Sequence, residues 1–321
     1  MLSRHYLRVK TLQAVYSFFI GGETDLSKGR QELFDAIEGI SELMMYQISA
    51  LLEVRDFAEN KLEENKKKLR PSEADLDPNR KFIDNPVIKI LRENETIQNR
   101  IQSLKINWSE FQEQFRKIYF AMVEWKDYKE YLDSPADSFE DHKIFVAKLF
   151  KKHIAFDGNL RAYYEELNLH WGEDSITSGL NLNNWIKSLD ENNETTHIPG
   201  EVFNSNALPG NDDDRDFVKE LFDKCIMNSE EYDGMIQKKI SNWEIDRINQ
   251  IDMLILKLGL TEILEFPRIP VKASMNEYIE LAKEYGTPKS NAFVNGVLDK
   301  LVAELQEAGK IKKSGRGLKG S

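Results

Sequence analysis

Apolar residues recur at helical spacing along almost the whole chain, and no run alternates with the period of a β-strand. The first helical pattern has an apolar stripe of Leu7, Thr11, Ala14, Val15 and Phe18, and it ends at the glycine pair 21–22. A second helical pattern follows over residues 26–67, with one expected interruption. These patterns predict an all-α fold built from long helices.

The region between residues 243 and 305 carries the clearest helical patterns. A stripe of Ile248, Ile251, Ile255 and Leu258 follows Trp243, and the proline-containing stretch 266–270 ends that helix. The next two helices have buried faces expected to contain Tyr278, Ile279, Leu281, Ala282 and Tyr285, and then Phe293, Val297, Leu301 and Leu305.

Three local features refine the expected ends of these helices. Ser274 and Glu277 have the spacing of a capping box, which would start a helix at this point. Gly286 suits a C-terminal cap. Gly296 lies inside the last helix, where it indicates close approach of another backbone at a propensity cost near ~1 kcal/mol.

Three stretches are typical of boundaries: residues 71–79, 133–137 and 189–214, the last being rich in Asn, Pro, Gly and Asp. We therefore expect four parts. They are an N-terminal helical part at 1–69, a helical insertion at 70–205, a C-terminal helical domain at 206–309, and a flexible basic tail at 310–321.

A partial internal repeat is visible in the second half of the chain. Seven residues from Phe145 to Trp171 recur unchanged from Phe217 to Trp243, at a constant offset of 72 positions. The pattern predicts two helices, a tryptophan at the end of the second, and then a third helix. Phe82 and Trp108 have the same separation, but Pro86 would interrupt the first helix of that copy. Chance similarity between amphipathic helices is the competing interpretation.

Charge is distributed unevenly along the chain, whose net charge is −11. Residues 1–22 hold three basic residues and no acid, and residues 308–321 hold five and no acid, whereas the remainder holds 36 basic and 55 acidic residues. Such ends can direct a polyanion to one surface, although ordinary solvated termini fit the pattern equally well. The single cysteine, Cys225, and the lack of a leader-like start or an apolar membrane-spanning run indicate a cytoplasmic protein.

Several strings resemble the NusB family: WEIDRINQIDMLIL from Trp243, NEYIELAK from Asn276, FVNGVL from Phe293, and RHYLRVKTLQAVY from Arg4. The resemblance covers about residues 1–55 and 213–305, and the long segment between them looks like a lineage-specific extension. It implies an all-α fold of two packed halves. It also implies a transcription antitermination factor that binds single-stranded boxA RNA with the small-subunit ribosomal protein NusE. The complex would act on elongating RNA polymerase, notably at rRNA operons.

The resemblance assigns RNA contact to the start of the first helix and to the start of the last. In the first helix, Arg4, His5 and Arg8 occupy two turns beside the apolar stripe, where a guanidinium can pair with phosphate or stack on a base. His5 departs from the family's arginine. The remaining RNA candidates are Lys10, Lys289, Ser290 and Phe293, of which Phe293 is as well explained by the core. Ala292 stands where the family often has lysine.

Tyr16, Asp246 and Asp252 match positions that face NusE in this family, and the competing interpretation of the two acids is a solvated helix face. No enzyme motif is present. The histidines are scattered without metal-ligand spacing, no glycine-rich phosphate loop occurs, and Cys225 lies among apolar residues. We therefore expect no catalytic site, no metal and no cofactor.

Two alternatives to the antitermination factor remain. The acidic body, His5 and Ala292 favour a helical protein-interaction scaffold that has lost RNA binding. Some RNA cytosine methyltransferases carry a NusB-like domain, but residues 306–321 leave no room for their catalytic domain. Retention of Arg4 and Arg8 favours the RNA-binding adaptor.

Overall fold

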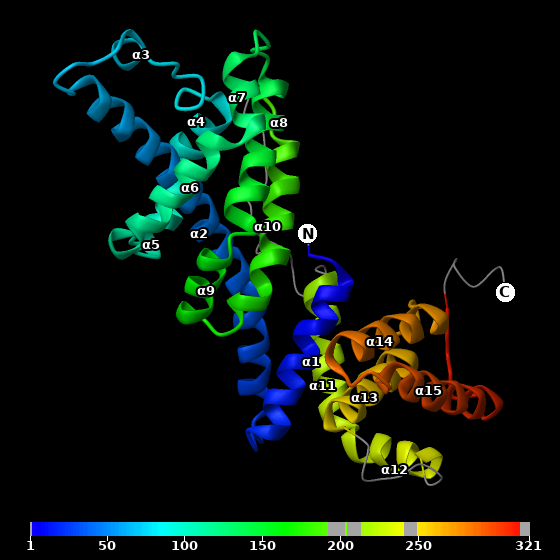
Figure 1. Cartoon of the computed structure of the whole chain (residues 1–321). Helices are drawn as coiled ribbons and strands as arrows, with labels where there is room; N and C mark the ends of the chain where they lie inside the picture. Colours follow the sequence, from blue (N-terminus) through cyan, green and yellow to red (C-terminus); the bar gives the residue numbers. More distant parts are fainter. Residues whose placement is uncertain (1, 192–202, 204–212, 241–248, 315–321) are drawn as a thin grey trace. The chain divides into compact units, whose positions relative to one another are not determined.

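The computed structural model describes residues 2–191, 203, 213–240 and 249–314, and every regular element within these ranges is helical (Figure 1). The expected all-α fold class is therefore confirmed. The chain divides into two compact units. We call Leu2–Ile37 with Phe203–Ser321 the terminal unit, and Glu38–Val202 the middle unit.

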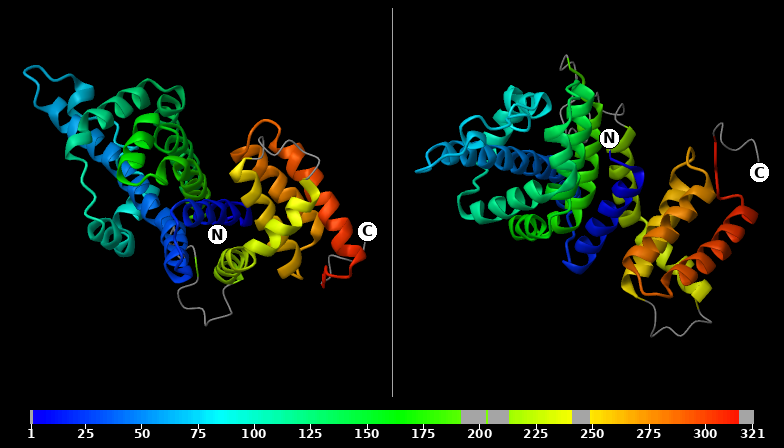
Figure 2. Two further views of the ribbon diagram at one scale, coloured as in Figure 1. Left: turned by 90° about the horizontal axis from the view of Figure 1, so that it is seen from below. Right: turned by 45° about the horizontal axis from the view of Figure 1, so that its top comes forward.

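The terminal unit combines residues from the N-terminal and C-terminal parts of the chain. Its helices are α1 (Arg4–Ile20), the start of α2 (Leu26–Lys66), α11 (Asp213–Met227), α12 (Ser229–Ile240), α13 (Gln250–Glu265), α14 (Val271–Tyr285) and α15 (Ser290–Glu307). Helix α1 packs against α11 and α13, and α13, α14 and α15 pack against one another; α14 and α15 lie side by side in both views of Figure 2. The apolar stripe predicted for α15 is buried throughout.

The middle unit is built on the remainder of α2. Helices α8 (Phe139–Phe150) and α10 (Trp171–Ser188) pack together, and α9 (Gly158–Leu167) packs on α10. Its further elements are α3 (Glu73–Leu76), α4 (Pro86–Glu93), α5 (Glu95–Ser103), η1 (Ser109–Phe111), α6 (Gln112–Glu124), α7 (Lys126–Asp133) and η2 (Lys151–Ala155). Element η2 is a short π-helix that continues α8.

Helix α2 corrects two expectations. It runs for 41 residues as one helix, so the predicted interruption is wrong. The boundary between the compact units falls at residues 37 and 38, inside α2, and not after residue 69. Before that point Arg30 of α2 pairs with Asp223 of α11 at 2.9 Å, and after it Gln47 donates to the Ser175 carbonyl of α10 at 2.9 Å. Whether residues 70–205 are a lineage-specific insertion stays a prediction.

Two details of the last helices differ from expectation, and the predicted C-terminal cap at Gly286 is confirmed. Helix α14 begins at Val271, after Pro270, so Ser274 lies within it and does not cap it. Gly286 does end α14, but its φ of −92° is not left-handed; a side chain there would meet Ser290 and a carbonyl of α14. The predicted close approach at Gly296 is wrong, because a Cβ there would meet no atom of the described residues within 4 Å.

The predicted repeat is matched in helix order only as far as the described residues reach. Helices α8 and α9 precede Trp171, which begins α10, and α11 and α12 precede α13. Trp243 lies outside the described residues, so the equivalence of the two tryptophans stays a prediction. Pro86 does not interrupt a helix: it is the first residue of α4, where proline fits.

The expected flexible tail is partly anchored. The Lys313 ammonium donates to the carbonyl oxygens of Glu262 and Phe266, at 3.2 and 2.9 Å, at the end of α13. The Ser314 amide donates to the Pro267 carbonyl at 2.8 Å. The Lys313 ammonium thereby supplies a donor to carbonyls at the helix end, where partners within the helix run out. Residues 315–321 lie outside the described residues.

Candidate nucleic-acid interface

The first turn of α1 presents two of the predicted RNA-binding side chains. Ser3 caps the helix by accepting from the Tyr6 amide, so α1 begins at Arg4. The Arg4 Nε lies 2.7 Å from Asp214 Oδ1, and its guanidinium lies 4.4 Å from the centre of the Phe217 ring. The Arg4 side chain is 40% exposed, so it is accessible while it is held by α11.

His5 lies between two carboxylates of α14. Its Nδ1 is 3.0 Å from Glu277 Oε2, and its Nε2 is 3.2 Å from Glu284 Oε1. Both acids are partly exposed. A phosphate that approached His5 would therefore meet two negative charges, which the sequence analysis did not anticipate because the acids lie some 270 residues further along the chain.

Arg8 is buried, which contradicts its expected exposure beside the apolar stripe. Its Nε and Nη2 each donate at 2.8 Å to the two carboxylate oxygens of Glu262, a residue with no exposed surface. Burial alone would lower the pKa of Arg8, but the hydrogen bond and the charge of Glu262 outweigh it and raise that pKa. Arg8 thus joins α1 to α13 and is not available to RNA in this structure.

Glu262 is the centre of a polar cluster that sequence reasoning missed. Besides Arg8, the Ser274 hydroxyl donates to it at 2.8 Å and the Tyr278 hydroxyl at 3.0 Å. Full pairing makes a buried charge tolerable. The available signal was a single acid within the largely apolar stretch at residues 254–264.

Lys10 is also buried, at 1% exposure, and its ammonium lies 5.5 Å from the centre of the Tyr6 ring. Its expected phosphate contact is contradicted, because a side chain that is closed off from solvent cannot meet a strand of RNA without rearrangement. The face of α1 that carries Lys10 is thus a packed face.

The start of α15 keeps one of its three candidates exposed. Lys289 is exposed and precedes the first residue of the helix. Ser290 is buried, and its hydroxyl donates to Asp252 Oδ2 at 2.8 Å and accepts from the Thr287 amide. Phe293 is buried as well, so of its two interpretations the structure supports the core. Lys289 alone of these three can reach a phosphate.

The candidate partner-binding residues differ in their exposure to solvent. Tyr16 is 40% exposed on α1. Asp252 is 3% exposed and bonded to Ser290, so its expected place on a solvated partner-facing surface is wrong. Burial raises the pKa of Asp252, and the hydrogen bond from Ser290 opposes that rise. Asp246 lies outside the described residues.

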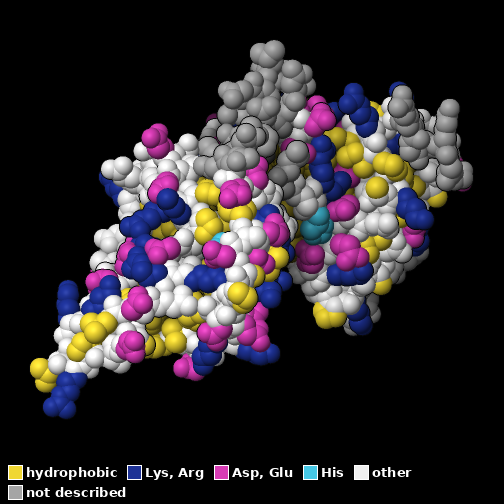
Figure 3. All heavy atoms as spheres, turned by 90° about the horizontal axis from the view of Figure 1, so that it is seen from above, with side chains coloured by type: hydrophobic (Ala, Val, Ile, Leu, Met, Phe, Trp, Pro, Cys, Tyr) yellow, Lys and Arg dark blue, Asp and Glu magenta, His cyan; other side chains and the backbone are white. Residues whose placement is uncertain are grey.

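We call Arg4, His5 and Lys289 the α1 surface. His5 contacts Glu284 in the last turn of α14, and Lys289 follows Glu284 by five positions, so the Cα atoms of Glu284 and Lys289 lie within about 18 Å of each other. Figure 3 shows basic and acidic side chains interspersed over the visible face, without one broad basic field. The arrangement can offer separate cationic contacts to a flexible strand.

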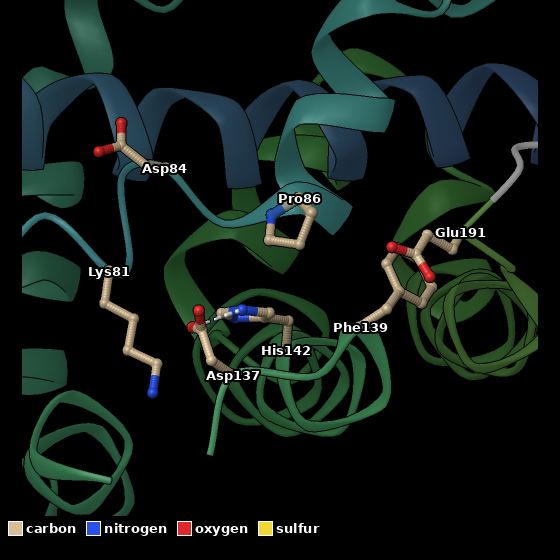
Figure 4. A pocket seen from close by; sticks show the side chains of 7 residues that line it. All are labelled: Lys81, Asp84, Pro86, Asp137, Phe139, His142 and Glu191. Carbon is tan, nitrogen blue, oxygen red and sulfur yellow. Dashed lines mark ion pairs between the residues drawn. The ribbon is translucent and has the colours of Figure 1, made fainter. Parts of the chain in front are cut away.

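The middle unit contains a pocket lined by Lys81, Asp84, Pro86, Asp137, Phe139, His142 and Glu191 (Figure 4). His142 Nε2 lies 3.1 Å from Asp137, and His142 Nδ1 lies 2.7 Å from the Tyr131 hydroxyl. The Lys81 ammonium donates to the carbonyls of Ser134 and Ala136, so it holds the turn between α7 and α8. His142 and Lys81 thus make contacts that stabilise the fold of the middle unit.

The described residues offer little for metal or nucleophile chemistry. No group of three or more potential metal-ligating His, Cys, Asp or Glu side chains occurs among them. Cys225 is fully buried, and burial raises the pKa of its thiol to about 12. Within the described ranges, no helix combines the length and the apolar character needed to cross a bilayer.

The fold is all-α, and the α1 surface places the accessible cations Arg4 and Lys289 at the starts of α1 and α15. The model of the NusB family matches residues 180–303. The transcription antitermination protein NusB of Bacillus licheniformis is 42% identical over 121 residues, which are 38% of this chain and 92% of that protein. The chain belongs to the NusB family.

Two further proteins of the same name match over shorter shares of their length. That of Salinibacter ruber is 46% identical over 106 residues, 33% of this chain and 66% of the relative. That of Chloroherpeton thalassium is 40% identical over 104 residues, 32% of this chain and 49% of the relative. The chain thus spans about half to two thirds of these two relatives, and no solved structure matches it. The family-model match does not include α1.

Proposed function

We propose that this protein is a transcription antitermination factor that binds single-stranded boxA-like RNA together with the ribosomal protein NusE. The complex acts on elongating RNA polymerase, notably at rRNA operons. Membership of the NusB family and the printed names of the relatives support the proposal. The structural observation that carries it is the half-exposed Arg4 at the first turn of α1, in one surface with His5 and Lys289.

The contacts of Arg4 suit exchange with a phosphate. Its ion pair with Asp214 is partly exposed, and such pairs contribute at most about 1 kcal/mol, so an incoming phosphate can replace the carboxylate at little cost. A guanidinium forms two parallel hydrogen bonds with phosphate and can also stack on an unpaired base. Lys289 adds a flexible point charge immediately before the first residue of α15.

For the protein partner, Tyr16 is the exposed candidate among the described residues, and Asp246 stays a candidate outside them. An exposed tyrosine combines a large apolar area with a hydroxyl, which is typical of protein interfaces. Asp252 is not proposed to contact NusE, because its side chain is buried. NusE would therefore be recognised mainly through the exposed side of α1 that carries Tyr16.

A second function is favoured by a specific observation. Of the seven residues expected to contact RNA, Arg8, Lys10, Ser290 and Phe293 are buried. This fits a protein-interaction scaffold that has lost RNA binding. Transcription in vitro distinguishes the two: with NusE and a boxA-containing template, the protein should increase readthrough of a terminator. Readthrough that does not depend on boxA would favour the scaffold.

A further inference from the structure

The greater part of α8 and the η2 segment that continues it, in the middle unit, carry a local excess of basic residues within an acidic chain. Residues 142–156 contain four lysines and no acid, although the chain as a whole has a net charge of −11. Three of those lysines are exposed: Lys148 and, about one turn later, the adjacent Lys151 and Lys152. Positive charge is therefore concentrated at a place that does not belong to the α1 surface.

The backbone here is unusual. Helix α8 continues without a break into η2, a π-helix of five residues. Such segments are rare and frequently mark functional sites, because they cost hydrogen-bond geometry. Lys151 and Lys152 open the segment, and His153 is buried within it, with an Nε2 that has no hydrogen-bond partner among the described residues.

The exposed lysines are combined with aromatic rings. The Lys152 ammonium lies 4.8 Å from the centre of the Trp125 ring, and the Lys151 ammonium lies 5.8 Å from that of Phe156. The Phe156 ring is 47% exposed. Lys148 pairs with Asp127 at 3.2 Å, whereas neither Lys151 nor Lys152 has a carboxylate partner in the part of the chain that the structure describes.

We propose that this face, formed by Trp125, Lys148, Lys151, Lys152 and Phe156, binds single-stranded nucleic acid. Two lysines without carboxylate partners can neutralise phosphates, and an exposed phenylalanine offers a stacking surface for an unpaired base. Bases in a duplex are stacked on one another and cannot use Phe156, so a single strand fits the face better than a double strand. The site is separate from the α1 surface and does not depend on it.

The test uses the full chain carrying Arg4→Ala and Lys289→Ala, so that the α1 surface does not contribute. Binding of a short oligouridine is titrated at several salt concentrations. Adding Lys151→Gln and Lys152→Gln should flatten the slope of log affinity against log salt by about 1.4, because each phosphate neutralised on a single strand contributes about 0.7. If the parent variant binds no oligouridine, or if the lysine variant keeps its slope, the proposal fails.

A matched control removes the same charge from the same unit. Lys66 and Lys68 are paired with Glu63 and Asp75, at 2.8 and 2.9 Å, so Lys66→Gln with Lys68→Gln should leave the slope nearly unchanged. An equal loss in this control would mean that general charge attraction, and not this face, binds the strand.

Stacking of a base on Phe156 can be tested separately from the lysine contacts. Phe156→Ala should weaken oligouridine binding by about 5- to 150-fold, since stacking contributes about 1–3 kcal/mol per base, and should leave the salt slope unchanged. Duplex RNA should bind more weakly than oligouridine and should not respond to Phe156→Ala. Equal binding of duplex, or no effect of Phe156→Ala on the single strand, would contradict the assignment to single strands.

Discussion

Arg8 of α1 and Glu262 of α13 form a buried two-pronged ion pair, with both nitrogen–oxygen distances at 2.8 Å. The pair joins the first helix of the chain to the C-terminal helices. A residue that family resemblance assigns to RNA contact is thus a structural link in this protein, and the two roles predict opposite results on mutation.

Arg8→Ala should lower the free energy of unfolding by about 3–5 kcal/mol, because it leaves the Glu262 carboxylate buried without its main partner. Urea unfolding followed by circular dichroism measures the change. The control is Arg8→Met combined with Glu262→Gln, which removes both charges and keeps an amide oxygen that can accept from Ser274 or Tyr278, so it should recover part of the stability. A loss below about 1 kcal/mol for Arg8→Ala would be typical of an exposed ion pair and would contradict the burial.

The contact of Lys313 with the end of α13 predicts a pH dependence. Burial lowers the pKa of Lys313 to about 8, against an opposing effect of Glu262, from an ordinary value of 10.5. Between these values the unfolded chain binds more protons, so this group makes the free energy of unfolding rise with pH. Below about pH 8 the lysine is charged in both states and the cost of its burial is fully present.

Urea unfolding at several pH values between about 8 and 10.5 tests this, with Lys313→Gln as the comparison. The stability of the wild type relative to the variant should increase across that window. A constant difference would mean that Lys313 is solvated like an ordinary tail residue.

Cys225 should be inert in the folded protein. Its thiol is buried and the pKa is raised to about 12, so almost no thiolate is present near neutral pH, and the thiolate is the reactive form. Ellman's reagent should react with it only in concentrated guanidinium chloride. Rapid reaction under native conditions would show that the thiol is accessible and would reopen a chemical role.

Tyr16→Ala should weaken binding of NusE by about tenfold or more, because interface tyrosines commonly contribute above 1 kcal/mol. Calorimetry on the purified proteins gives the affinity. Tyr16→Phe is the control, since it keeps the ring and should retain most of the binding. If the alanine variant binds as tightly as the wild type, NusE contacts another surface.

Helix periodicity predicted the fold well where the burial pattern is regular. Leu7, Thr11, Val15 and Phe18 are all buried, as is the whole stripe of α15. The prediction for Arg8 was wrong because its charged side chain was taken as a sign of exposure, without regard to its position on the helix. Arg8 shares a face with Leu12 and Val15, both buried, so its position in the periodicity was that of a core residue.

The candidate site was harder to predict than the fold, because it depends on pairings between distant segments. His5 with Glu284, Arg8 with Glu262 and Ser290 with Asp252 are each separated by tens to hundreds of residues. Nothing in one sequence pairs such residues, although isolated charges inside apolar helices, such as Glu262, do indicate that a buried partner exists.

The central claim is that the α1 surface binds boxA-like RNA, and a salt-dependent titration of that RNA in the presence of NusE tests it most directly. Arg4→Ala combined with Lys289→Ala should flatten the slope of log affinity against log salt by about 1.4, since each residue would neutralise one phosphate. Stability should change little, because Arg4 is half-exposed and Lys289 is exposed. An unchanged slope in a folded variant would contradict the account, as would wild-type binding that does not distinguish boxA from a scrambled strand.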